Sequence, residues 1–219
     1  MLALALDGIR ARAHSLARRA ILWPRAVEGV AAVEFALILP VMVVLFFGLS
    51  EVTLAVNIDR KLTLLTRSLA DLSSRTRDLT TSEMNIVFGA AGAIMRPYNT
   101  PAPQMVVSSI AVTKSGSTYS GAVEWSCPKN LPQKASNETQ GAFDARTIND
   151  LKLRKKGDPY AVPAGFQSDT TKSFILSEAQ YLYVPVFGQY FAPTGKRLNE
   201  STPWPVRDND RVTGPSSCP

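Results

Sequence analysis

The stretch from Val30 to Ser50 reads VAAVEFALILPVMVVLFFGLS and carries a single charge, Glu34, among its 21 residues. At a rise of about 1.5 Å per residue, a helix of this length spans roughly 30 Å, which is the thickness of the hydrocarbon layer of a bilayer. Its apolar core runs from Phe35 to Leu49. The stretch therefore predicts a transmembrane helix, and the rest of the chain is organised around it.

The leader that precedes this helix is basic. Residues 1–29 hold five arginines against Asp7 and Glu28, so the leader contributes +3 to the chain's net charge of +6. Cations gather on the cytoplasmic side of membrane helices. We therefore expect a cytoplasmic leader and an exported remainder. A nucleic-acid-binding domain would instead gather basic residues on one folded face, so we expect no nucleic-acid partner.

A secretory signal peptide is the alternative explanation for a basic start followed by an apolar stretch. Such a peptide has an apolar region of about 7 to 15 residues that ends in a small-residue cleavage site. Residues 46–51 read FFGLSE and contain no such site. An uncleaved anchor, or one that is cut before the helix, fits the sequence better.

Histidine and cysteine limit the chemistry of the region after the membrane. The only histidine is His14 in the leader, so Ser-His-Asp and Cys-His catalysis are excluded downstream. Cys127 and Cys218 are too few for a zinc site of the usual kind, and we predict no metal and no other cofactor. They lie 91 positions apart, which does not fit a CxxC motif. In an oxidising compartment we expect them to form a disulfide.

The charged residues of the outer region suggest no active site. Glu124, Asp144 and Glu178 are dispersed in sequence, and we expect them to be solvated surface charges. The basic run 151–156, LKLRKK, lacks the aromatic platform of a nucleic-acid site and is expected to be a solvated loop or helix end. The sequence therefore predicts a protein that is not an enzyme.

An amphipathic helical stalk should follow the membrane segment. Apolar residues recur there at intervals of four and three: Ile58, Leu62, Leu65, Leu69 and Leu72. This spacing places them on one face of a helix that continues from about residue 30 to residue 74. The face could pack on the chain's own outer domain or on partner helices, and the sequence leaves both open. Residues 80–83, TTSE, predict the start of a second helix over 84–95.

Strand patterns begin after the proline-rich joint at 99–103. Residues 105–113 and 118–125 predict a β-hairpin around a turn at 114–117. Residues 173–186 predict a further strand, in which Pro185 indicates an edge or an end. The predicted fold class is α+β: a long N-terminal transmembrane helix with an amphipathic stalk, followed by a small, loop-rich, mainly β domain. The expected segments are the leader 1–29, the membrane helix 30–50, the stalk 51–98 and the outer domain 99–219.

Glu34 is the unusual residue of the membrane segment. A carboxylate costs about 2.5 to 3.5 kcal/mol at the bilayer centre and less near its edge, where the positive end of the helix dipole favours an acid. Gly29 lies five residues earlier and Phe35 follows directly, which gives the pattern G-x-x-x-x-E-F. This pattern resembles type IV prepilins, in the form seen in the tight-adherence (Tad) pilus system.

The resemblance implies a processing site and an assembly role. A prepilin peptidase would cut between Gly29 and Val30, and the new amine of Val30 would lie one helical turn from Glu34. The two charges could pair within one subunit or between subunits. In that family the glutamate pairs with a neighbour's new amino terminus during assembly, and Phe35 belongs to the same motif.

The order of leader, helix, stalk and hairpin resembles TadE/TadG-like pilus assembly proteins. TadG-type members are longer and typically lack the glutamate, so Glu34 favours the TadE-like side. The resemblance implies a minor pilin-like protein (a pseudopilin) of the bacterial inner membrane, with a single span and a periplasmic domain. Its implied partners are membrane lipid, a prepilin peptidase, and other pilin-like and Tad assembly proteins. The alternative is an uncleaved single-pass membrane protein whose periplasmic domain binds a ligand or partner, with Glu34 incidental.

Overall fold

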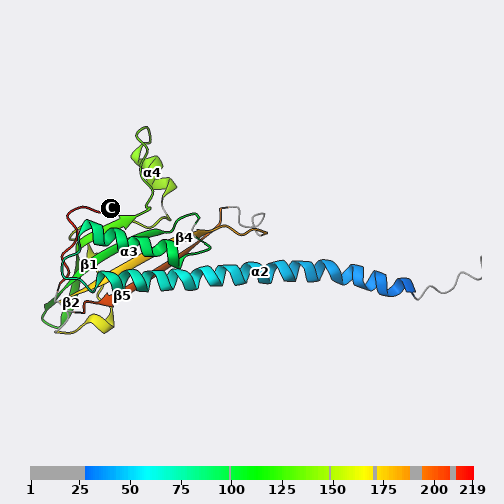
Figure 1. The fold of residues 1–219 in the computed structure, drawn as a ribbon, viewed down its shortest axis with the longest axis horizontal. Helices are drawn as coiled ribbons and strands as arrows, with labels where there is room; N and C mark the ends of the chain where they lie inside the picture. The colour runs from blue at the N-terminus through cyan, green and yellow to red at the C-terminus, as the bar shows by residue number, and fades with distance from the viewer. Residues whose placement is uncertain (1–27, 99, 148, 170–171, 188–193, 208–210) are drawn as a thin grey trace, which may run out of the picture. The chain divides into compact units, whose positions relative to one another are not determined.

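The structure is a computed structural model that describes residues 28–98, 100–147, 149–169, 172–187, 194–207 and 211–219 (Figure 1). The leader up to residue 27, with its five arginines and His14, lies outside the described residues. The chain divides into two compact units, Met1–Leu49 and Ser50–Pro219.

Helix α2 runs from Glu28 to Ser73 and comprises 46 residues, including Pro40. It contains the predicted membrane stretch and continues into the first part of the predicted stalk, so the continuous helix expected from about residue 30 to residue 74 is confirmed. A second helix, α3, spans Thr81–Ile94 and matches the helix predicted over 84–95. The α+β fold class is likewise confirmed, because a sheet follows these helices.

Within the described residues, five strands form one sheet in the order β3-β2-β1-β4-β5, and every neighbouring pair is antiparallel. The strands are β1 (Gln104–Ser115), β2 (Thr118–Lys129), β3 (Pro159–Tyr160), β4 (Ser173–Tyr183) and β5 (Lys196–Pro205). The predicted hairpin is β1 and β2, and the predicted further strand is β4, which ends two residues before Pro185. The sequence did not predict β5, β3, the short helix α4 (Gln140–Arg146) or the 3-10 turn η1 (Ala164–Phe166).

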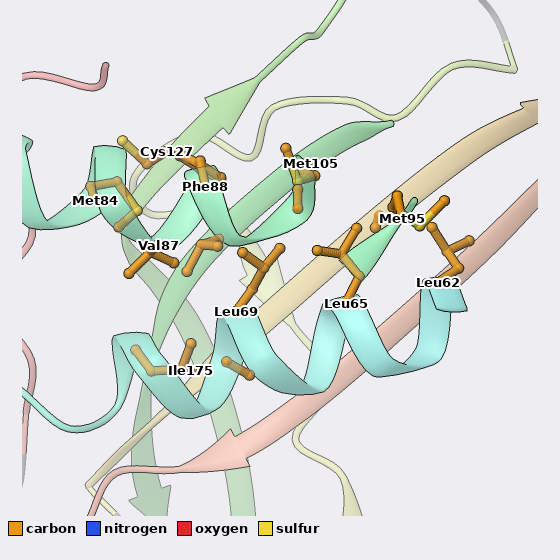
Figure 2. Packing of buried hydrophobic residues seen from close by; sticks show 14 of the residues in the cluster. Leu62, Leu65, Leu69, Met84, Val87, Phe88, Met95, Met105, Cys127 and Ile175 are labelled. Carbon is orange, nitrogen blue, oxygen red and sulfur yellow. The ribbon is translucent and has the colours of Figure 1, made fainter. Parts of the chain in front are cut away.

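The apolar face of the stalk packs on the chain's own sheet. Ile58, Leu62, Leu65 and Leu69 are buried in a cluster to which α3 and strands β1, β2 and β4 also contribute. Figure 2 shows the α2 leucines directed toward side chains of α3 and of the sheet. The fifth residue of the predicted stripe, Leu72, is exposed, one residue before α2 ends. Of the two partners that the sequence allowed for this face, the structure selects the outer domain.

The opposite face of the sheet carries a smaller apolar cluster: Ile110, Val112, Val123, Val162, Phe174 and Leu176. A β-bulge brings Val123 to this face. Ser109 pairs with Trp125 while Ile110 pairs with Val123, so Glu124 is an extra residue in β2. Because side chains alternate along a strand, one extra residue reverses the faces that follow it. Cys127 consequently lies in the helix-covered cluster and Val123 in the other.

Polar contacts fix both ends of α3. At its start, the Thr80 hydroxyl accepts the Glu83 N–H at 3.2 Å, and the Glu83 carboxylate accepts the Thr80 N–H at 2.8 Å. The Thr80 backbone donor, and then its hydroxyl, lower the pKa of Glu83. The resulting stabilisation is therefore present above the ordinary pKa of Glu83 and is lost as the pH falls through the lowered value. At the far end, Lys61 Nζ donates to the Ile94 carbonyl at 2.9 Å, where the helix dipole favours a cation.

Replacing Thr80 with alanine is expected to lower the free energy of unfolding by about 1 kcal/mol, because the Glu83 N–H loses its acceptor. The melting temperature should fall by roughly 2–4 °C. The measurement is thermal unfolding of the full chain in detergent, followed by tryptophan fluorescence. Thr118→Ala, at an exposed position at the start of β2, is the control. An equal loss in both variants would show that the capping contacts add nothing.

The C-terminal tail is bound to the helix-covered side of the sheet. Cys127 and Cys218 form the disulfide that the sequence predicted. Thr213 pairs with the segment before α3, since it accepts the Leu79 N–H at 3.0 Å and donates its own N–H to the Arg77 carbonyl at 2.9 Å. Trp125 Nε1 donates to the Val212 carbonyl at 2.7 Å. These contacts join the last residues of the chain to β2 and to the start of α3.

Candidate functional site

The four predicted processing and assembly residues lie in the first turns of α2. Gly29 and Val30 belong to its first turn, and Glu34 is one helical turn beyond Val30 on the same face. The side chains of Val30, Glu34 and Phe35 are all exposed. A Cβ added at Gly29 would meet no atom within 4 Å. The backbone at the predicted cut is therefore open, and it tolerates a larger residue than glycine.

Exposed apolar side chains surround α2 on all sides after this point. They are Val30, Val33, Phe35, Leu37, Ile38, Leu39, Val41, Met42, Val43, Val44, Leu45, Phe46 and Leu49. Residues 41–46 are consecutive and all exposed, and six residues exceed one helical turn. An apolar surface without a polar face requires lipid or other apolar helices around it. The helix is long and apolar enough to cross a membrane, which indicates a single-pass membrane protein.

A second site lies where the apolar stretch ends. The Tyr183 hydroxyl at the end of β4 donates to Glu51 Oε2, and the Phe187 N–H donates to Glu51 Oε1 at 2.6 Å. Burial, followed by the hydrogen bond to the carboxylate, raises the pKa of Tyr183, so its hydroxyl stays protonated as a donor. Glu51 thus binds the end of β4 and the segment after it to α2, directly after the predicted membrane segment.

Sequence reasoning missed this role of Glu51. The signal that could have found it is a lone carboxylate immediately after an uninterrupted apolar run, where an unpaired charge is costly. What the sequence could not supply is the partner, because Tyr183 and Phe187 lie more than 130 residues away along the chain.

The acidic residues that were expected to be solvated have separate environments. Glu178 is buried, so the expectation for it was wrong; Arg154 binds both of its carboxylate oxygens at 2.6 Å. The hydrogen bonds to Glu178 raise the pKa of Arg154, and the negative charge of the carboxylate adds to this effect. Glu124 pairs with Arg211 at 3.2 Å, and the exposed Asp144 accepts a bond from Gln140 at 2.9 Å. Each acid has its own partner, and these contacts form no common site.

The basic run 151–156 is only partly the solvated loop that the sequence predicted. Lys152, Lys155 and Lys156 are exposed, as expected. Arg154, in contrast, is half-buried by its ion pair with Glu178 and by the Tyr160 ring, whose centroid lies 5.0 Å from the guanidinium carbon. The run therefore includes an internal ion pair of the sheet domain.

Comparison with known protein families supports the resemblance found in the sequence. Residues 29–71 match the family described as TadE-like protein. The match begins at the predicted cleavage glycine and ends close to the last residue of α2, so the sheet lies outside it. Comparisons with curated proteins and with solved structures gave no match.

Proposed function

We propose that this TadE-like chain is a minor pilin-like subunit of a Tad pilus assembly machinery, anchored in the bacterial inner membrane through α2. The match over residues 29–71 suggests a membrane protein associated with the Tad pilus. The observation that carries the finer proposal is the start of α2, an exposed apolar helix in which Gly29 and Val30 are adjacent and Glu34 lies one helical turn beyond Val30.

The proposed processing step is hydrolysis of the peptide bond between Gly29 and Val30 by a prepilin peptidase. Water supplies a hydroxyl to the new Gly29 carboxylate and a proton to the new Val30 amine. The cut removes the basic leader and leaves the apolar helix with an amino terminus. One turn further on, Glu34 supplies the opposite charge within reach of that amine in the same chain or in a neighbouring helix.

The proposed role of the exported part is structural. Residues 50–219 form a unit in which α2 and α3 cover one face of the sheet, and we place this unit in the periplasm. The apolar helix offers a continuous surface to other pilin-like helices, whereas the sheet domain offers polar surfaces to the assembly machinery. We assign the chain no catalytic step. An uncleaved anchor with a binding domain is the competing function, and the cleavage experiment separates the two.

Cleavage should depend on Gly29. In cells that co-express the full chain and a prepilin peptidase, amino-terminal sequencing is expected to begin at Val30 for the wild type. Gly29→Ala is expected to reduce the processed fraction at least about tenfold, which corresponds to roughly 1.4 kcal/mol of lost transition-state stabilisation. Because a Cβ at this position meets no atom within 4 Å, the loss would report recognition by the peptidase and not a folding defect.

The matched control is Gly48→Ala, since Gly48 also lies in α2 with open space around its Cβ position. This variant should be processed as the wild type is. A chain that begins upstream of Val30 despite active peptidase, or equal processing of both alanine variants, would overturn the processed form of the proposal and favour the uncleaved anchor.

A further inference from the structure

The segment after β4 exposes an unusual group of apolar side chains. Residues 184–187 read VPVF, and Val184, Val186 and Phe187 are 48%, 59% and 50% exposed. The apolar surface continues into a hollow of about 240 Å³ beside the segment, to which Leu54 and Tyr181 contribute. Single exposed apolar residues are common on proteins, but a contiguous group marks a surface that contacts an apolar partner.

Two hydrogen bonds hold this segment beside Glu51 of α2. Glu51 accepts hydrogen bonds from the Tyr183 hydroxyl and from the Phe187 N–H, the latter at 2.6 Å. Glu51 is the residue after Ser50, at which the predicted membrane stretch ends. The segment 184–187 therefore lies within one side chain's length of the point where the chain leaves the apolar run. This placement depends only on contacts within the unit Ser50–Pro219.

The apolar surface of α2 continues past this level. Val52 and Val56 are 61% and 43% exposed, and they lie on a face of α2 different from that of Glu51. Residue 56 is about 7.5 Å further along the helix than residue 51. These exposed valines favour a bilayer edge close to the level of Glu51. Val184, Val186 and Phe187 are then at the depth of the membrane interface.

A cation accompanies this apolar group. Lys196, the first residue of β5, pairs with Tyr183 across the sheet and is exposed. A lysine beside apolar and aromatic side chains is the combination that binds the interface of membranes with anionic lipids, since the ammonium meets the phosphates and the apolar groups meet the upper acyl chains. An apolar helix of a partner protein would cover the apolar side chains but would offer no anionic group to Lys196.

We propose that residues 184–187, with Lys196, insert into the interface of the membrane that α2 crosses and form a second contact with lipid. This inference rests on the membrane anchoring in the proposed function, but not on cleavage at Gly29. The hydrogen bonds to Glu51 serve two purposes in it. They hold the segment at the membrane edge, and they supply donors to a carboxylate that would otherwise face an apolar environment alone.

Depth-dependent quenching tests the proposal. The full chain carrying Phe187→Trp is reconstituted into vesicles of phosphatidylcholine and phosphatidylglycerol, with or without bromine on the upper acyl chain. Subtraction of the wild-type signal removes Trp23, Trp125 and Trp204. Brominated lipid is expected to quench at least about half of the added emission. Val186→Trp provides a second probe in case the first variant does not fold.

The control probe is Ile86→Trp, because Ile86 is 71% exposed on α3. Ile86 lies in the first half of α3, whereas Lys61 contacts the last residue of that helix, Ile94. Its added emission should be quenched by less than about a tenth, since it lies outside the interface. If the chain resists carbonate extraction while neither probe, at 187 or at 186, is quenched, that result would overturn the lipid contact but not the membrane anchoring. Blue-shifted but unquenched emission would assign the segment to a protein contact instead. Extraction of the chain by carbonate would overturn the anchor and the lipid contact together.

Discussion

The full chain with Leu65→Ala is expected to lose about 3 kcal/mol of its free energy of unfolding, the usual cost of deleting a fully buried leucine side chain. Leu65 is 0% exposed and lies in the cluster that α2, α3 and the sheet share (Figure 2). The loss combines lower burial of apolar surface with the cavity that is left behind. In thermal unfolding followed by tryptophan fluorescence, the midpoint should fall by roughly 6–12 °C.

Leu64→Ala is the matched control for this result. Leu64 precedes Leu65 on the same helix, carries the same side chain and is 56% exposed. Its removal should change the free energy of unfolding by less than about 0.5 kcal/mol. The chain is measured alone in detergent, so only contacts within it contribute. Similar small effects in both variants would mean that the apolar face of the stalk packs on partner helices and is not part of the domain's own core.

This face illustrates how far the sequence predicts the fold. The spacing of Ile58, Leu62, Leu65 and Leu69 was sufficient to predict a helix with one apolar side, because periodicity is a local property. The identity of the surface that covers this side is a non-local property. Strands β1 and β4 begin 35 or more residues after Leu69, and nothing in the stripe itself distinguishes them from a neighbouring subunit's helix.

Strand β5 was missed for a related reason. Its sequence, KRLNESTPWP, holds two prolines and few apolar residues, and it shows no alternation that would predict a half-buried strand. The segment is an edge strand whose residues are at most half-buried, and its pairing with β4 determines its conformation. Prolines are tolerated at a sheet edge because one side of the strand has no neighbour that requires the N–H. The bulge at Glu124 escaped prediction likewise, since it is visible only in the register of β1 and β2.

The residues of the candidate site were likewise predictable from the sequence only in part. Its processing residues follow from a short motif within one helix, so Gly29, Val30 and Glu34 could be proposed from the sequence alone. The contact between Glu51 and β4 required knowledge of which distant segment returns to the end of the membrane stretch. The same limit applied to Glu178, whose ion-pair partner Arg154 lies in a loop 24 residues earlier.

Glu34→Gln is expected to abolish pilus assembly while leaving membrane insertion intact. Its amide keeps the shape of the side chain and removes the charge that would pair with the Val30 amine. Removing one partner of an ion pair in a low-dielectric environment costs about 3–5 kcal/mol, which corresponds to at least a hundredfold weaker association. The measurement is the number of filaments per cell, with resistance to carbonate extraction as the readout of insertion.

Glu200→Gln is the control for this variant, because it makes the same chemical change in β5, far along the chain from the helix start. It should assemble normally. Glu34→Asp keeps the charge on a shorter side chain and should restore part of the assembly. Normal filaments with Glu34→Gln would make Glu34 incidental and would favour the uncleaved anchor with a binding domain.

A double-mutant cycle with Gly29→Ala then tests whether the charge acts through the new amine. In an uncleaved chain Val30 has no amine, so Glu34→Gln should add nothing to the defect of Gly29→Ala if the two groups are coupled. The yield of crosslinks between neighbouring α2 helices in membranes provides a graded readout for both variants. Additive losses would instead assign Glu34 a contact that does not depend on cleavage. Mixing wild-type and Glu34→Gln chains separates the remaining cases, because pairing between subunits predicts that the variant also weakens its wild-type neighbours, whereas pairing within a chain does not.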